Sequence, residues 1–203
     1  SLLGKAALLG ILFGLCGLAF SASLAFMKRK MAVWMPDPRV RILLCGALIS
    51  FLILLLHQGR YAGLGTNLID MSQGAGEIFW YDWLLKGALT VLTLSAGFQG
   101  GEVTPLFSIG ASLGAVLAPA FGLSAASGAA LGYASVFASA SNTLIAPILI
   151  GAEVFGLQAL PFFVVSVAFS RLFNHGRSIY PQRGNSGVSG GENGNIRPSS
   201  EKD

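Results

Sequence analysis

The chain contains 203 residues, of which 53% are hydrophobic and only 11% are charged, and its mean hydropathy is +0.68. These values exclude an ordinary soluble domain and are typical of a chain that crosses a membrane. The formal net charge of +4 comes without a basic and aromatic face, so nucleic acid is not an expected partner. The two cysteines lie in apolar segments at no metal-binding spacing, and neither a metal nor a cofactor is expected.

The first two predicted elements are apolar helices joined by a basic loop. The first helix, over 2–27, is long enough to span the bilayer and contains small residues that let neighbouring helices approach closely. The loop KRKMAVWMPDPRVR has five basic residues and one acid, which predicts a cytoplasmic location. The second helix is predicted over 41–56. A polar connection then leads to Trp80, Tyr81 and Trp83, whose rings favour the headgroup region.

Shorter apolar helices are predicted in the second part of the chain. We expect them over 86–96, 103–121 and 125–142, followed by two apolar pieces within 144–173 that are divided at Gly156. The segment 125–142 is rich in Ala, Ser and Gly, so it should be buried among other helices.

The end of the chain loses its hydrophobicity after Tyr180. Residues 181–203 are rich in Gly, Ser and Asn, and we expect a disordered tail there. Basic residues lead into this tail and indicate the cytoplasmic side of the membrane. We therefore predict a membrane region over 1–180 and a polar cytoplasmic tail over 181–203.

The segment SAGFQGGEVTPLFSIGASLG contains the candidate functional site. Gly100 and Gly101 allow close approaches that side chains forbid, and Pro105 favours the first turn of a helix. The backbone amides expected to lack a partner at membrane depth are those of Val103, Thr104, Leu106 and Phe107. An anion would satisfy these amides and the positive end of the helix dipole. An ordinary helix break capped by Thr104 is the alternative interpretation.

Glu102 is the one acid that this apolar segment contains. A carboxylate inside the membrane is costly and usually faces a cavity, where it is suited to proton uptake and release. A glutamate at the membrane surface that complements the helix dipole would explain the same residue. Physical reasoning on the sequence leaves both interpretations open.

Four segments resemble the CLC family of chloride channels and anion/proton exchangers. GGEVTPLFSIGASLG is similar to the GGxFxP-type motif that opens a helix toward the central anion site of that family, and SNTLIAPILIGAEVFG, GRSIY and GLGTNLI resemble further family segments. The resemblance extends over nearly all of 2–180. It implies an all-α polytopic membrane protein, here a CLC-like second inverted repeat with short broken helices. The sequence GGEVTP resembles the corresponding motif of the fluoride/proton antiporter branch of that family.

The resemblance also assigns roles to particular residues. The residues implied in binding of a chloride or fluoride ion are Glu102, Val103 and Thr104 through the start of the helix, and Tyr180 through its hydroxyl. The motif itself consists of Gly100, Gly101 and Pro105. Glu102 is further implied in proton coupling. An aromatic anchor at the membrane interface is the alternative for Tyr180.

Members of the resembled family contain two inverted halves, and the GSGIP-like and GREGP-like motifs of the first half are not found here. We therefore expect a truncated product or a piece of a longer chain, which would not conduct alone. The implied function is transmembrane transport of a halide anion as part of a voltage-gated chloride channel or CLC-type transporter, with protons as partners in an exchanger. The implied setting is a homodimer in a lipid membrane, the inner membrane in bacteria.

Two other functions compete with halide transport. The stretch GASLG, 110–114, fits the pattern of serine hydrolases, but that pattern requires a strand-to-helix elbow, whereas Ser112 should lie inside a helix. Close helix packing explains these small residues better, so an enzyme is not expected. A non-transporting membrane subunit or dimerisation scaffold is the second alternative, because a piece of a dimeric protein can still associate.

Overall fold

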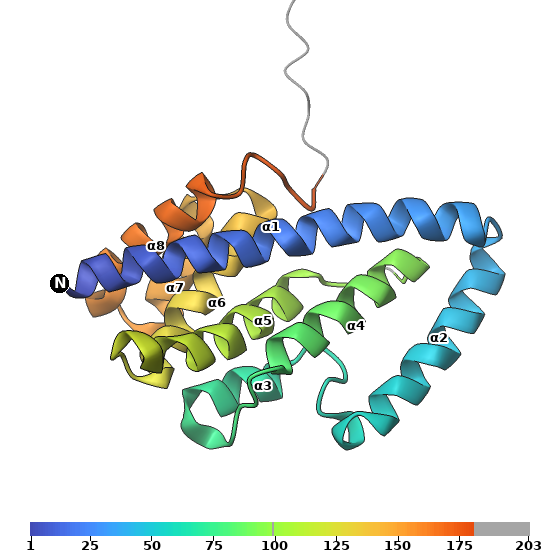
Figure 1. Cartoon of the computed structure of the whole chain (residues 1–203), viewed down its shortest axis with the longest axis horizontal. Helices are drawn as coiled ribbons and strands as arrows, with labels where there is room; N and C mark the ends of the chain where they lie inside the picture. The colour runs from blue at the N-terminus through green and yellow to red at the C-terminus, as the bar shows by residue number, and fades with distance from the viewer. Residues whose placement is uncertain (99, 181–203) are drawn as a thin grey trace, which may run out of the picture.

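The computed structural model describes residues 1–98 and 100–180, and Figure 1 shows their arrangement. Every regular element within these residues is helical, so the predicted all-α fold is confirmed. The α-helices of this part are α1 (Leu2–Trp34), α2 (Pro38–Leu55), α3 (Thr66–Asp70), α4 (Asp82–Ala96), α5 (Val103–Leu117), α6 (Ala125–Ser141), α7 (Ile145–Phe155) and α8 (Leu160–Leu172). The predicted tail over 181–203 lies outside the described residues.

The basic segment after the first apolar stretch is largely helical, and the loop predicted there is wrong. α1 continues through it to Trp34, because Lys, Arg, Met and Ala are good helix formers. The helix ends before Pro36, since a proline disfavours helical conformation in the residue that precedes it. α2 then begins at Pro38, and Asp37 caps it by accepting from the amide of Arg39 at 2.9 Å. The two helices therefore meet at a tight elbow.

The connection between α2 and α4 contains more structure than the sequence predicts. α3 lies within it and is followed by a π-helical turn, Met71–Ala75. α4 begins at Asp82, earlier than the predicted residue 86. Elements this short give no clear hydrophobic period, which is why the sequence pattern does not reveal them.

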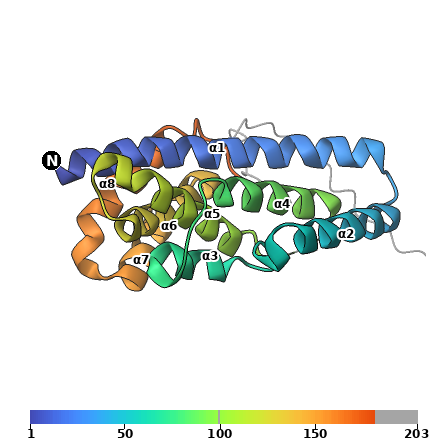
Figure 2. The same ribbon diagram turned by 60° about the horizontal axis from the view of Figure 1, so that its bottom comes forward.

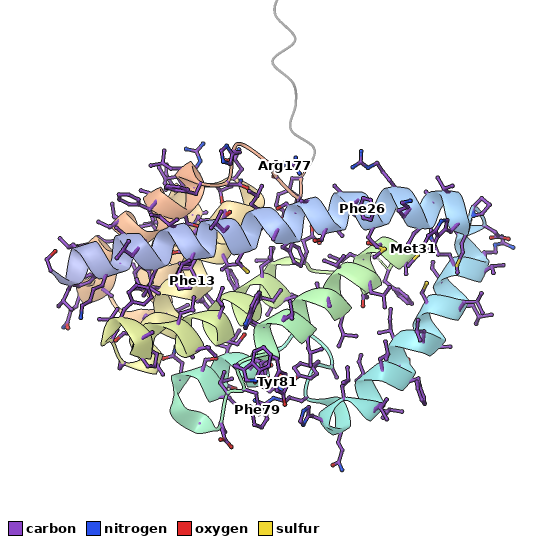
Figure 3. The ribbon with its side chains drawn as sticks, viewed as in Figure 1. Phe13, Phe26, Met31, Phe79, Tyr81 and Arg177 are labelled. Carbon is purple, nitrogen blue, oxygen red and sulfur yellow. The ribbon has the colours of Figure 1, made fainter. Side chains whose placement is uncertain are left out.

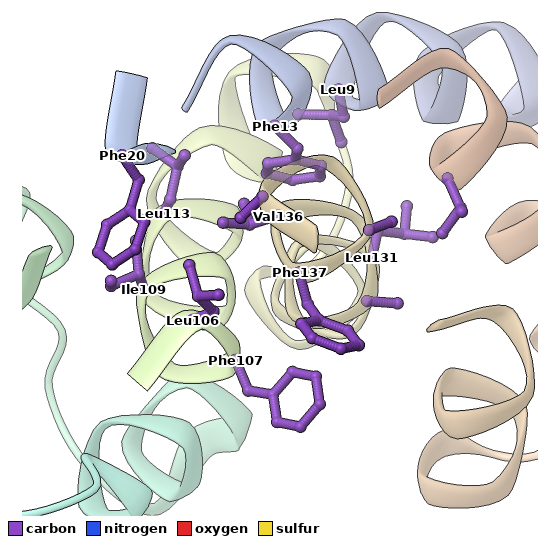
Figure 4. Close-up of a cluster of buried hydrophobic side chains, with 14 of the residues drawn as sticks. Leu9, Phe13, Phe20, Leu106, Phe107, Ile109, Leu113, Leu131, Val136 and Phe137 are labelled. Atoms are coloured by element: carbon purple, nitrogen blue, oxygen red, sulfur yellow. The ribbon is translucent and has the colours of Figure 1, made fainter. Parts of the chain in front are cut away.

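α1, α5, α6 and α8 share one hydrophobic core, shown in Figure 4. Phe13 of α1, Ile109 of α5 and Val136 of α6 are almost completely buried in it. α5 and α6 approach so closely that a Cβ atom added at Gly110 would collide with the carbonyl oxygen of Gly132. The predicted burial of the Ala/Ser/Gly-rich segment among other helices is therefore confirmed.

Within residues 1–98 and 100–180, three segments are long and apolar enough to cross a membrane: α1, α2, and α5 with the 3₁₀ turn that follows it, Val103–Phe121. α7 and α8 are apolar but shorter. Figures 1 and 2 show α1 running along the whole molecule, with α5, α6 and α8 beside its N-terminal part and α4 beside its C-terminal part, whereas α2 turns away from the end of α1 and packs against α4. The end of α4 consequently lies next to the elbow between α1 and α2.

Candidate functional site

α5 begins where the sequence predicts a helix start. Its first residue is Val103, and Glu102 precedes it at the N-cap position. Gly100 and Gly101 are exposed and lie in irregular backbone, whereas Pro105 is buried in the first turn. The glycine pair thus brings a non-helical chain up to the free end of a buried helix.

The first turn of α5 carries unpaired backbone amides. Those of Glu102, Val103 and Thr104 donate to no acceptor among the described residues. The amides of Leu106 and Phe107, predicted to be free as well, belong to the helical ladder, and that of Leu106 donates to the carbonyl of Glu102 at 3.3 Å. No described side chain, that of Thr104 included, caps the helix, so the alternative of a break capped by Thr104 is wrong. Three neighbouring N–H groups remain available at the positive end of the helix dipole.

The chain returns to this helix start after α8. The segment 174–180 crosses the C-terminal end of α6, where the amide of Ile179 donates to the carbonyl of Ala140 at 2.8 Å. Tyr180 follows, is 40% exposed, and its hydroxyl has no hydrogen-bond partner in the described part of the chain. Burial and the negative charge of Glu102 both raise the pKa of Tyr180, so the two side chains lie within electrostatic range. Tyr180 therefore lies on the same side of the molecule as the N-cap residue of α5, within range of its charge.

A buried polar cluster at the start of α4 is not selected by the sequence pattern. It lies next to Phe79 and Tyr81, which Figure 3 labels. Asp82 is 0% exposed and accepts from Nε and Nη2 of Arg60, at 3.1 and 2.6 Å, and from the hydroxyl of Tyr61 at 2.6 Å. The hydrogen bond to Asp82 raises the pKa of Arg60, and burial raises the pKa of Tyr61. An acid in the first turn of a helix is the only sequence signal for this cluster.

Lys86 extends the cluster toward the start of α5. The side chain of Lys86 is 2% exposed, and its Nζ donates to the carbonyls of Tyr61 and Gly63 at 3.0 and 2.7 Å. It lines a cavity of about 250 Å³ that also reaches Gly101 and Pro105. A buried cation without a carboxylate partner among the described residues therefore faces the same region as the free amides.

The hydrolase alternative does not fit the structure. Ser112 lies fully buried inside α5 and donates to the carbonyls of Ser108 and Ile109, at 2.7 and 3.2 Å, as serines in helices do. No strand precedes it within residues 1–98 or 100–180. The same described residues contain no group of three His, Cys, Asp or Glu side chains that could hold a metal ion.

Apolar helices combined with a helix that begins in irregular backbone and presents unpaired amides beside a carboxylate are features of membrane transport proteins. The family model described as voltage gated chloride channel matches residues 1–175 of the chain. The chain therefore belongs to this family, the CLC family, as the motifs in its sequence predict.

Two relatives show how far the similarity extends. A chloride/fluoride channel protein of Pseudomonas syringae pv. tomato is 38% identical over 181 residues, which cover 84% of this chain and 39% of that protein. A crystal structure of a CLC-type fluoride/proton antiporter is 54% identical with a TM-score of 0.86, and the match covers 89% of this chain and 46% of that one. The chain thus spans less than half the length of either relative, in line with the expectation of a partial CLC chain.

Proposed function

We propose that this chain carries the second half of a halide pathway and takes part in the transmembrane transport of fluoride or chloride. The observation that supports this most directly is that the start of α5 presents three backbone amides without an acceptor among the described residues, while Tyr180, whose hydroxyl also has no partner there, lies within electrostatic range of Glu102. A halide ion accepts hydrogen bonds and donates none, so it requires a site built from donors. The residues proposed to contact the ion are Glu102, Val103 and Thr104 through their amides and Tyr180 through its hydroxyl.

Fluoride is the halide that we favour, with Glu102 as the group that exchanges protons. The sequence GGEVTP and the 54% identity to a fluoride/proton antiporter support this choice over chloride. Fluoride is small and strongly hydrated, so hydroxyl donors such as those of Thr104 and Tyr180 would help to replace its water. Glu102 is half-buried at the N-cap position, where it would exchange a proton beside the ion.

A flux experiment on a complete protein tests this proposal. The chain is joined to the first half of the fluoride/proton antiporter relative, reconstituted in liposomes, and assayed for fluoride, chloride and proton movement. We expect fluoride efflux faster than chloride efflux, and Glu102→Gln should abolish proton movement while anion binding persists. Proton movement that survives Glu102→Gln would remove this role for the residue. A joined protein without any flux would favour the alternative of a non-transporting scaffold.

We further infer a homodimer in the bacterial inner membrane, with the elbow of α1 and α2 and the C-terminus on the cytoplasmic side. The basic residues at the elbow and after α8 support this orientation. The exposed side chains of Ile145 and Leu149 on α7 offer apolar surface to lipid or to a second subunit. Labelling of an Arg39→Cys variant with a membrane-impermeant reagent should succeed only from the cytoplasmic side.

A further inference from the structure

A cavity of about 430 Å³ lies beside Glu102, between the end of α4 and the elbow of α1 and α2. Figure 1 shows the end of α4 next to this elbow, and Figure 3 labels Met31 on the adjoining part of α1. The charged side chains on the wall of the cavity are Lys28 of α1, Arg41 of α2 and Glu102. Two cationic side chains and one carboxylate thus line a cavity that is large enough for an ion and several water molecules.

Arg41 is held in a fixed position at the edge of this cavity. Its Nε donates to the carbonyl of Ala96 at 3.0 Å, and its Nη1 donates to the carbonyl of Met35 at 3.5 Å. The guanidinium therefore lies at the negative end of the α4 dipole, where a cation is favoured. An arginine has five N–H groups, so these two bonds leave donors that no acceptor in the described residues uses. The guanidinium has no carboxylate partner there either.

Ser95 supplies an unusual hydroxyl on the same wall. The residue is 3% exposed, and its Oγ has no hydrogen-bond partner among the described residues. Hydroxyl side chains in helices commonly donate to the carbonyl four residues earlier, and Thr90 and Thr93 of the same helix do so at 2.7 Å. Buried polar atoms are nearly always paired, so an unpaired Oγ that lines a cavity points to a ligand in that cavity.

We propose that this cavity is a second anion subsite, in which Ser95 and Arg41 donate hydrogen bonds to a halide ion and Lys28 contributes positive charge. The inference rests on the proposed function for the identity of the ion. Glu102 borders both this cavity and the start of α5, so the two anion positions would be neighbours. An ion reaching the α5 amides from the side of the elbow would occupy the subsite first.

Calorimetric titration of the full chain in detergent with sodium fluoride, against a sodium gluconate blank, tests the subsite. We expect two binding events in the unaltered chain. Ser95→Ala and Arg41→Gln should each weaken one event about tenfold, as expected for the loss of one hydrogen bond to a charged group. Tyr180→Phe should weaken the other event. Arg39→Gln, an exposed change at the same elbow, serves as the control and should leave both unchanged.

The folded state of the variants provides a second readout. Because the Oγ of Ser95 is unpaired, Ser95→Ala should leave the thermal unfolding temperature unchanged or raise it, so weaker binding would not reflect misfolding. Glu102→Gln removes the one carboxylate of the wall and should strengthen binding in the subsite about threefold.

Three outcomes would overturn the inference. The first is a titration with a single binding event, which Tyr180→Phe weakens but Ser95→Ala and Arg41→Gln do not. This result would rule out the subsite and leave the proposed function intact. Absence of any fluoride or chloride binding would remove the halide assignment of both positions. An anionic phospholipid that is retained in native mass spectrometry and lost in Ser95→Ala and Arg41→Gln, with fluoride binding unaltered, would make the cavity a lipid site.

Discussion

The carboxylate of Asp82 is fully buried and forms an ion pair with Arg60. Removing one partner of a buried ion pair leaves the other charge uncompensated. We therefore expect Asp82→Ala to lower the free energy of unfolding by about 3 to 5 kcal/mol, measured by thermal or denaturant unfolding in detergent. Asp70→Ala, a change at an exposed acid, is the matched control and should cost little. Equal stability of the two variants would show that the ion pair between Asp82 and Arg60 does not stabilise the fold.

Substitution of Thr104 can distinguish a role in ion binding from a role in folding. Its side chain is half-buried and makes no capping hydrogen bond, so Thr104→Val should change the free energy of unfolding by less than about 0.5 kcal/mol. If its hydroxyl contacts the ion, fluoride affinity should fall about tenfold in a calorimetric titration. Thr66→Val is the control, because its side chain is exposed and lines neither of the two cavities beside the start of α5. Unchanged affinity in Thr104→Val would exclude its hydroxyl as a ligand.

The raised pKa of Tyr180 makes a prediction about pH. Burial and the charge of Glu102 both disfavour the phenolate, so the hydroxyl stays protonated as the pH rises past the ordinary pKa of a tyrosine. The contribution of Tyr180 to halide binding should therefore persist through that range and disappear only as the pH passes the raised pKa. In Glu102→Gln the pKa of Tyr180 should fall but remain raised by burial. NMR titration of the Tyr180 ring measures this, and an unaltered pKa would place Glu102 out of range.

At the scale of elements, the contact between α5 and α6 depends on glycines. Gly110→Ala would push a methyl group into the carbonyl of Gly132, and overpacking of this kind costs about 1 to 3 kcal/mol. We expect a lower unfolding temperature for this variant. Gly87→Ala is the matched control in α4, because its methyl group would meet only Ile109 Cδ1, at 3.8 Å. That change should be neutral or stabilising through helix propensity, and similar losses in both variants would contradict the contact argument.

The same scale shows what the sequence can and cannot predict. The start of α5 is predictable because Pro105 and the glycine pair determine the local backbone conformation. The burial of α6 is predictable because its small residues allow close helix contacts. The extension of α1 to Trp34 could not be predicted, because positive charges indicate the cytoplasmic side of the membrane but do not end a helix. The pairing of the Leu106 amide depends on which residue becomes the N-cap, and a sequence pattern fixes that only to within a turn.

At the scale of the molecule, the candidate site is assembled from distant segments. Tyr180 comes within range of Glu102 because the segment after α8 bonds to the end of α6, and Arg41 and Ser95 line one cavity because α2 packs against α4. No local pattern encodes these approaches, so the sequence alone assigns Arg41 to membrane orientation and leaves Ser95 unnoticed. The role proposed for Tyr180 rests on the family resemblance, which carries tertiary information that residue spacing does not.

The openness of the site predicts that this chain binds a halide without transporting it. Gly100 and Gly101 are exposed and Tyr180 is 40% exposed, so an ion at the start of α5 would have protein donors on one side and remain open on the other. Transport requires enclosure on both sides, because an ion leaves water only for a complete set of partners. We expect fluoride to bind the chain in detergent, with liposomes containing the chain alone no leakier than empty ones. Fluoride flux from the chain alone would show that its own copies complete the pathway.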